Sequence, residues 1–431
     1  MCKLKIYNIG ALKNVELTLN KLTVLLGPQS SGKSTITRVL CHCQWIEKRC
    51  YVNFEEESKR LMQGTNFIDG IKEYYRMDGY FREDSQIHYE GNYIILDYRD
   101  ERLSISKVLQ PTSYLYPKLC YIPAERNLVT AIPNLKKYNE TNDLILYFMY
   151  DWFTAREYLK KLDITQLVDR SIKYEYNKDS DTDRIFDGSS SPLKLSNASS
   201  GVQSLLPLYG VVLYVVDSIY KRFKPLSSEE KIQLEQAVVS VKEISERLKA
   251  LQESIAAKSE DPEVISEKFE DLKDSDLVKY VMSHQMEIES LLDSSNRTFF
   301  YQRSDLYVEE PEQNLFPDAQ FNIVYWLISQ LINNDRDHSL FITTHSPYIL
   351  FALNNCMLGS LVSSSISETE KPSFHSRHSW IDPQKVNVYE IYDGKLRSIQ
   401  DKSGLLINNY LNNAYRQVNS EYLNLLDFYE D

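Results

Sequence analysis

An eight-residue loop, Gly27 to Ser34, constrains the fold of this chain more than any other stretch. It fits the pattern G-x-x-x-x-G-K-[ST], follows the apolar run Leu22 to Leu26, and precedes helical spacing from Lys33 to about Cys50. This context is typical of a phosphate-binding loop, because the glycines let backbone N–H groups surround phosphates at a positive helix end. We therefore expect an ATP and Mg²⁺ site, with Lys33 on the β- and γ-phosphates and Ser34 on the metal. The residues expected to contact the nucleotide here are Gly27, Pro28, Gln29, Ser30, Ser31, Gly32, Lys33, Ser34 and Thr35.

Polar residues also follow two further apolar runs of the buried-strand type. The first run, Asp305 to Val308, ends in Glu309 and Glu310. A carboxylate at a strand end can hold Mg²⁺, and its neighbour can act as a general base on the attacking water. We assign Glu309 to the metal and Glu310 to the water. The second run ends at His345, whose imidazole can contact the γ-phosphate. The predicted catalytic residues are Glu310, His345 and Lys33.

A second Ser- and Gly-rich segment precedes an apolar helix that we expect to start near Leu205. Hydroxyls and backbone N–H groups at a helix N-terminus form an anion-binding nest. One active site needs only one such nest, so the second is expected to bind a nucleotide held by another molecule. Its predicted contact residues are Ser199, Ser200, Gly201 and Gln203.

Charge and hydropathy exclude several protein classes. The chain of 431 residues has 49 Lys and Arg against 61 Asp and Glu, a net charge of −12. This charge argues against a protein that coats nucleic acid, although a local basic groove stays open. The N-terminus has no signal-peptide pattern, and the longest mostly apolar run, Leu205 to Val216, is too short to span a bilayer. We expect a cytoplasmic protein.

Two clusters of metal-binding residue types are interpreted as structural. Cys41, His42 and Cys43 lie in an expected helix, where neighbours two apart point to different faces, so no shared zinc is expected. The run Asp179, Asp181 and Asp183 lies in a polar loop or hairpin and is expected to be solvated.

Spacing along the rest of the chain predicts three β-hairpins or small sheets, at 3–19, 86–107 and 386–399. Helical spacing is expected over 55–77, 140–175 and 405–428. Residues 228–295 have a heptad seam broken by Asp261-Pro262, which predicts an antiparallel helical hairpin, with an ordinary two-helix layer as the alternative. The expected domains are the ATPase core at 1–110 and 296–400, a helical lobe with the second nest at 111–225, the arm at 226–295 and a helical tail at 401–431.

These elements, in this order, resemble the ABC class of ATPases, in which two heads enclose ATP between the phosphate loop of one and the signature of the other. Ser200-Gly201-Val202-Gln203 is similar to the Ser-Gly-Gly-Gln signature, with Val202 replacing a glycine, and His345 matches the switch histidine. Three stretches resemble OLD-type, RecF-type and SMC-type ATPases rather than transporters: Leu4 to Val15, Tyr121 to Arg126 and Glu309 to Glu312. The resemblance implies an α/β P-loop NTPase of ABC head type, with a helical lobe and an inserted hairpin. It also implies a homodimer or higher homo-oligomer joined through ATP.

The chain departs from the family pattern at three places. No glutamine stands clearly at the Q-loop position, where Glu125 and Arg126 are the candidates. The segment Asn314 to Pro317 lacks the histidines that family members often have after the carboxylates. The arm follows the signature, whereas SMC-type coils precede it.

OLD-type enzymes carry a fused TOPRIM nuclease, and the stretch after His345 is too short for one. The chain therefore resembles stand-alone ATPase subunits of two-component phage-defence systems, such as the PARIS-type AriA or the Septu-type PtuA, which gate a separate nuclease. Two alternatives remain open: a RecF- or SMC-like DNA repair clamp, and a scaffold whose ATP site locks an oligomer. We expect partners to dock on the arm, Leu234 to Ile255, and on the tail, Tyr422 to Phe428.

Overall fold

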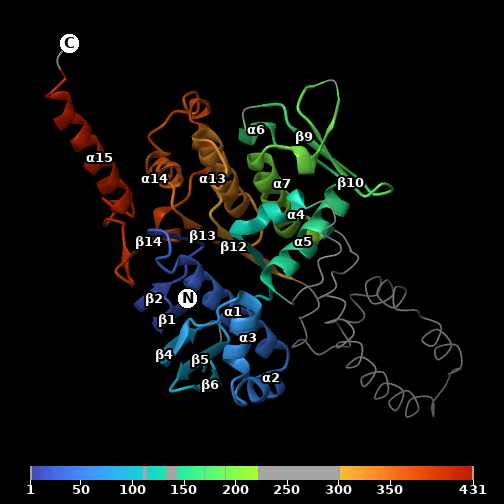
Figure 1. Ribbon diagram of the computed structural model, residues 1–431, viewed down its shortest axis with the longest axis vertical. Coiled ribbons are helices and arrows are strands. Elements are labelled where there is room, and N and C mark those ends of the chain that lie inside the picture. The colour runs from blue at the N-terminus through green and yellow to red at the C-terminus, as the bar shows by residue number, and fades with distance from the viewer. Residues whose placement is uncertain are drawn as a thin grey trace, which may run out of the picture. The chain divides into compact units, whose positions relative to one another are not determined.

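A computed structural model describes residues 2–109, 114–132, 143–168, 170–189, 191–221 and 301–429 (Figure 1). One compact unit is made of two stretches of chain, Met1–Tyr220 and Tyr301–Asp431. The chain between them, Lys221–Phe300, forms a second unit, so the predicted arm at 226–295 lies outside the described residues.

The first unit is built on an eleven-stranded mixed sheet. Five neighbouring strands of this sheet are parallel: β14 (Val386–Tyr392), β3 (Leu22–Leu26), β13 (Ser339–Thr344), β12 (Arg303–Glu309) and β7 (Pro117–Ile122). Every residue of β3 is buried, as the continuous apolar run predicts. Because parallel strands end at the same edge of a sheet, the loops after β3, β12, β13 and β7 meet there.

The other half of the sheet is mainly antiparallel, and its strands alternate buried and exposed residues. It continues from β14 through β15 (Lys395–Ser398), β2 (Leu12–Thr18), β1 (Lys3–Ile9), β4 (Phe81–Glu90), β5 (Ile94–Arg99) and β6 (Arg102–Lys107). The three predicted hairpins and small sheets are confirmed as β1–β2, β4–β5–β6 and β14–β15.

Helices cover both faces of the sheet. Alternate residues of β3 belong to different core clusters, with Val24 in one and Leu25 in the other. The Leu25 cluster contains residues of α1 (Lys33–Val52), α2 (Phe54–Leu61) and α3 (Asn66–Tyr75), and Figure 1 shows α2 and α3 on the side of β5 and β6. The Val24 cluster contains α5 (Leu144–Leu159), α7 (Ser200–Leu213), α13 (Pro317–Ile332) and α14 (Pro347–Val362). This two-faced cover is the α/β arrangement that the sequence predicts.

The lobe at 111–225 contains strands as well as helices. Helical spacing was expected as far as residue 175, but α5 ends at Leu159 and Lys160 has a positive φ of 55°. A four-stranded sheet follows, formed by β8 (Lys161–Asp163), β9 (Lys173–Asn177), β10 (Thr182–Phe186) and β11 (Leu193–Lys194). The helix prediction is therefore wrong beyond residue 159. Short helices α4 (Leu128–Ala131) and α6 (Thr165–Val168) complete the lobe.

The aspartate run in this lobe is not simply solvated. Arg156 of α5 is 6% exposed and donates to Asp183 at 2.6 Å and Asp181 at 3.0 Å. Tyr174 and Tyr176 of β9 donate to the same two carboxylates, at 2.5 and 2.8 Å. The expectation of a solvated run is wrong for Asp183, which is part-buried, whereas Asp181 is exposed as expected, although both neutralise a buried guanidinium.

α7 continues through a π-helical turn, η4 (Tyr214–Ser218), into α8 (Ile219–Lys221). The span Ser200–Ser218 is long and apolar enough to cross a membrane, but 78% of its 18-residue window is buried inside the unit. It is therefore a core helix. The last helix, α15 (Tyr410–Leu426), confirms the predicted tail helix and contains no buried residue.

Candidate functional site

The phosphate-loop sequence forms a tight turn between β3 and α1. Gly32, the N-cap of α1, has a φ of +102°, and a Cβ there would lie 2.5 Å from Cδ2 of Leu12. Both the left-handed backbone and the contact with β2 therefore require glycine. The first turn of α1 carries no acidic residue, so its N–H groups and the helix dipole favour an anion.

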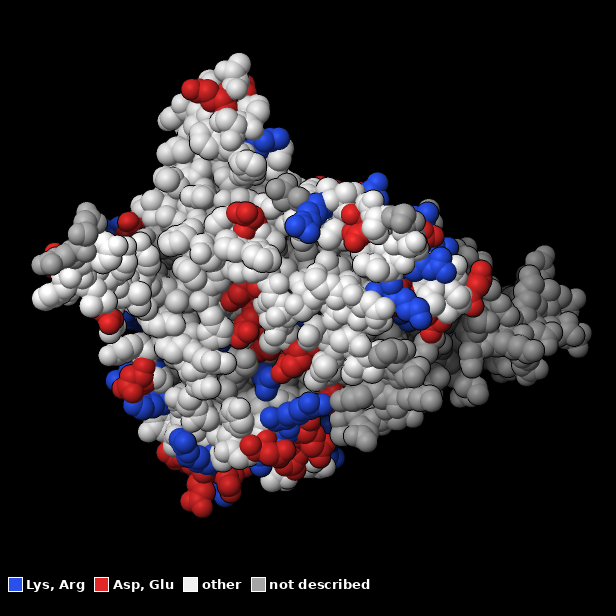
Figure 2. Space-filling model, turned by 45° about the horizontal axis from the view of Figure 1, so that its top comes forward, with Lys and Arg blue, Asp and Glu red and all other residues white. Residues whose placement is uncertain are grey.

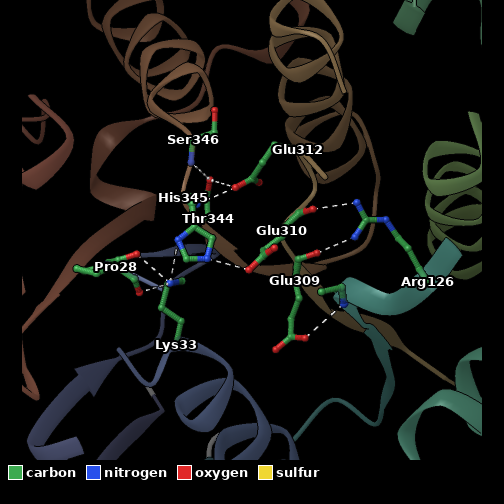
Figure 3. A network of polar contacts seen from close by, with 11 residues as sticks. Pro28, Lys33, Arg126, Glu309, Glu310, Glu312, Thr344, His345 and Ser346 are labelled. Carbon is green, nitrogen blue, oxygen red and sulfur yellow. Dashed lines mark hydrogen bonds and ion pairs between the residues drawn. The ribbon is translucent and has the colours of Figure 1, made fainter. Parts of the chain in front are cut away.

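Lys33 lies at the centre of this loop and is 5% exposed. Its ammonium group donates to the carbonyls of Gly27 at 2.8 Å and Pro28 at 2.9 Å, and it lies 3.3 Å from Nδ1 of His345 (Figure 3). Burial lowers the pKa of Lys33 to about 8, while nearby carboxylates, Glu310 first, act in the opposite direction. Lys33 is thus a cation that carries no direct carboxylate partner among the described contacts.

Glu310 and His345 form a direct pair. Nε2 of His345 lies 2.8 Å from Oε1 of Glu310, and its Nδ1 faces the Lys33 ammonium (Figure 3). These contacts fit one tautomer, with the proton on Nε2 donated to Glu310 and Nδ1 accepting from Lys33. The hydrogen bond from His345 lowers the pKa of Glu310. Lys33, His345 and Glu310 therefore form one chain of polar contacts, although they follow three different strands.

Glu309 faces another part of the site. It is 2% exposed, and its carboxylate accepts from the Tyr121 hydroxyl at 2.8 Å and from the Ala124 N–H at 3.4 Å. Figure 3 shows this carboxylate turned away from that of Glu310. The sequence placed the two glutamates in different roles, and the structure places their side chains in different surroundings.

Sequence reasoning assigned no role to Glu312. Its Oε1 accepts from Oγ1 of Thr344 at 2.8 Å and from the N–H of His345 at 2.7 Å. Burial raises the pKa of Glu312, and its Oε2 is buried with no hydrogen-bond partner. Glu312 thus holds the backbone that carries His345. The feature of the sequence that could have indicated a role for Glu312 is its place among the carboxylates that follow β12.

The second nest lies at the start of α7. Ser199 is the N-cap, and Ser199 and Ser200 are exposed. The amide of Gln203 donates to the carbonyls of residues 195, 196 and 198, so it holds the preceding turn rather than pointing into solvent. A Cβ on Gly201 would lie 2.8 Å from the carbonyl of Asn314. No hydrogen bond between described residues links this nest to residues 27–35 of the same chain.

The residues present fit a phosphate group and a metal ion that this phosphate shares with the protein. Oγ of Ser31 is buried and has no hydrogen-bond partner, so the loop contains an unused polar atom. Within the described residues, no group of three or more His, Cys, Asp and Glu side chains could hold a metal ion alone. Mg²⁺ commonly binds through one or two protein oxygens together with substrate phosphates, and Ser34 and Glu309 suit that mode. The cysteines of α1 are buried and form no disulfide bond.

The sequence matches no protein-family profile and no curated protein. Among solved structures, the chain is similar to an SMC head domain from Thermotoga maritima, with 9% identity, a TM-score of 0.37 and coverage of 94% of this chain and 98% of that chain. An SMC head from Pyrococcus furiosus, bound to the C-terminal domain of ScpA, has 7% identity and a TM-score of 0.34, with coverage of 98% and 100%. The recombination mediator RecF has 11% identity and a TM-score of 0.29, with coverage of 92% and 97%. Values this low assign no activity, and function has to be argued from the residues of the chain itself.

Proposed function

We propose that this chain is an ATPase that binds ATP with Mg²⁺, hydrolyses it slowly, and associates with a second copy when ATP is bound. The observation that carries this proposal is the contact chain of Lys33, His345 and Glu310 at the carboxyl edge of the parallel strands. A cation can bind the transferred phosphate, and an oriented carboxylate with a hydrogen-bonding imidazole can position and deprotonate the attacking water.

Each of these residues has a distinct task. The Lys33 ammonium and the N–H groups at the start of α1 bind phosphate oxygens. Glu310 accepts a proton from the attacking water, and His345 holds its carboxylate in place through Nε2. Ser34 and Glu309 would hold Mg²⁺, which neutralises phosphate charge when it is bound. Slow turnover is expected because the site is completed only by a second head.

ATP affinity should fall as the pH rises through about 8. Burial lowers the pKa of Lys33 to about 8, whereas a bound phosphate favours the charged ammonium and raises it. Above this pH, binding therefore takes up a proton, and the Kd should rise by up to about tenfold per pH unit. Calorimetry between pH 7 and 9.5, in buffers of different ionisation enthalpy, measures the Kd and the proton uptake. A Kd that stays constant, with no proton uptake, would contradict this role of Lys33.

We propose that two heads associate because, among the described residues, no hydrogen bond links the nest at α7 to the phosphate loop of the same chain. A nest of exposed Ser199 and Ser200 at a helix N-terminus suits phosphates held by another molecule. In this arrangement the two copies would hold two nucleotides between them.

Ser200→Arg should block ATP-dependent association and leave nucleotide affinity nearly unchanged. The larger side chain would fill the nest, while the phosphate loop stays intact. Mass photometry with and without Mg²⁺ and ATP measures assembly, and Ser189→Arg, in an exposed loop before β11, is the matched control. An identical ATP response of Ser200→Arg and the control would show that the nest does not control assembly.

We further propose that head association gates a separate effector, such as a nuclease subunit of a phage-defence pair. This step is supported by the exposed apolar seam of α15, which repeats at heptad spacing. Tyr415, Val418, Tyr422 and Leu425 are 59 to 72% exposed. On the face that Figure 2 shows, Lys and Arg are interspersed with Asp and Glu, which favours a protein partner over a DNA clamp.

The double variant Val418→Asp and Leu425→Asp should lose the effector, because it places two charges in the apolar seam. Gln417→Asp with Asn424→Asp, about 100° around α15 from Val418 and Leu425, is the matched control and should retain it. The measurement is co-purification with the product of the neighbouring gene. Metal-dependent DNA cleavage by the purified chain alone would overturn the gating role.

A further inference from the structure

Arg126 is a buried cation with unusual partners. It lies in η1 (Ala124–Asn127), directly after β7, and is 1% exposed. A guanidinium group has five N–H donors, and here each can meet a different backbone carbonyl. The acceptors are the carbonyls of Ser204 at 3.1 Å, Glu309 at 2.9 Å, Glu310 at 2.8 Å, Pro311 at 3.3 Å and Pro123 at 3.4 Å. Burial lowers the pKa of Arg126 to about 10, so the group stays charged at neutral pH.

Four of these carbonyls belong to two elements of the site. Three of them lie at the end of β12 and in the loop that follows it, and one lies in the first turns of α7 (Figure 3 shows the bonds to Glu309 and Glu310). Two other contacts join the same elements: Nδ2 of Asn314 donates to Oγ of Ser204 at 3.0 Å, and Gly201 packs against the Asn314 carbonyl. These contacts hold the start of α7 against the loop that follows β12.

The backbone of Glu310 needs this support. Its φ is +44°, a left-handed conformation that is strained for a residue with a side chain. The N–H of Glu310 donates to the carbonyl of Thr343 at 2.9 Å, and Arg126 holds the carbonyl on its other side. Loss of the Arg126 bond would let this backbone relax and move the carboxylate away from His345.

We propose that Arg126 is a positioning residue that couples the α7 nest to Glu310 of the same chain. This inference rests on the proposed ATPase function. If the nest binds a nucleotide held by the second copy, Arg126 links the occupancy of that site to the geometry of the general base in its own site. Each head would thereby adjust its carboxylate to the nucleotide of the other.

The direct test is Arg126→Lys, because a lysine keeps the charge but has only three donors at one point and leaves at least two of the five carbonyls unpaired. A carboxylate displaced by about 1 Å should lower kcat by about 10²-fold, while the Kd for ATP stays within about threefold. Arg156→Lys is the matched control: Arg156 is also buried, but it binds Asp181 and Asp183 in the small sheet. Its kcat should stay within about threefold of the wild type at a similar loss of melting temperature.

A double-mutant cycle separates positioning from general damage. Ser200→Ala should lower kcat about tenfold in the wild type and have little further effect in Arg126→Lys, as expected for coupled residues. Effects that simply multiply would overturn the coupling.

Should Arg126→Lys melt far below its control, Asn314→Gly removes an exposed side chain that fastens the same two elements, at a φ of +61° that glycine adopts without strain. The proposal then requires a lower kcat at unchanged Kd, and a wild-type kcat overturns it. Failure of the proposed function looks different: the wild-type chain would not hydrolyse ATP at all. Wild-type hydrolysis with an Arg126→Lys kcat equal to that of the Arg156→Lys control would overturn this inference alone.

Discussion

Glu310→Gln should bind ATP with wild-type affinity and lose about 10³-fold in turnover, within the range for removal of a general base. The amide keeps the size of the side chain, and its oxygen can still accept from Nε2 of His345, but it cannot take the proton of the attacking water. Phosphate release measures turnover, and fluorescence titration with an ATP analogue measures affinity.

The control for this exchange is Asp318→Asn, an exposed carboxylate in the first turn of α13. It should keep wild-type turnover. If Glu310→Gln hydrolysed ATP within about threefold of the wild type, Glu310 would not be the base. Because trapped ATP should hold the heads together, the same variant is the suitable background for the assembly measurements.

Lys33→Ala should weaken ATP binding by about 100-fold, since charge-assisted hydrogen bonds of this kind contribute about 1.5–3 kcal/mol. The variant loses the only described cation within hydrogen-bonding distance of Gly27, Pro28 and His345. Calorimetry measures the Kd, and thermal unfolding establishes that the variant is folded.

Lys161→Ala, an exposed lysine of the small sheet, is the matched control and should bind ATP as the wild type does. A Kd of Lys33→Ala within about threefold of this control would remove Lys33 from the site. Loss of binding together with a collapse of the melting temperature would point instead to its hydrogen bonds within the loop.

The local parts of the site could be predicted from the sequence because each is a short pattern at a strand end. The apolar runs before Gly27, Glu309 and His345 fix buried strands, and the rule for parallel sheets then places their following loops at one edge. The role of Arg126 could not be predicted in this way. Its partners are backbone carbonyls, and a sequence does not state which carbonyls a fold will leave near one another.

The lobe shows a different limit of structure prediction from the sequence. Helical spacing continues past Leu159, but Tyr174 and Tyr176 alternate with polar residues in the two-residue period of a strand. The strand period extends over only five residues, so it is weak beside the helical signal that precedes it. Asp183 stands in a polar stretch of the sequence, which predicts a solvated side chain. Only the fold brings Arg156 to it.

The site of the chain's long insertion has a mechanical consequence. The chain leaves the first unit after Tyr220 and returns at Tyr301, and the Tyr220 hydroxyl lies 2.5 Å from Oγ of Ser304. On the outgoing side, one run of helix extends from Ser200 to Lys221, and on the returning side β12 extends from Arg303 to Glu309. Each of these elements has one end beside Tyr220 or Tyr301 and the other at the site. A displacement of the chain at these two residues would therefore reach the α7 nest and the two neighbouring residues Glu309 and Glu310 at once.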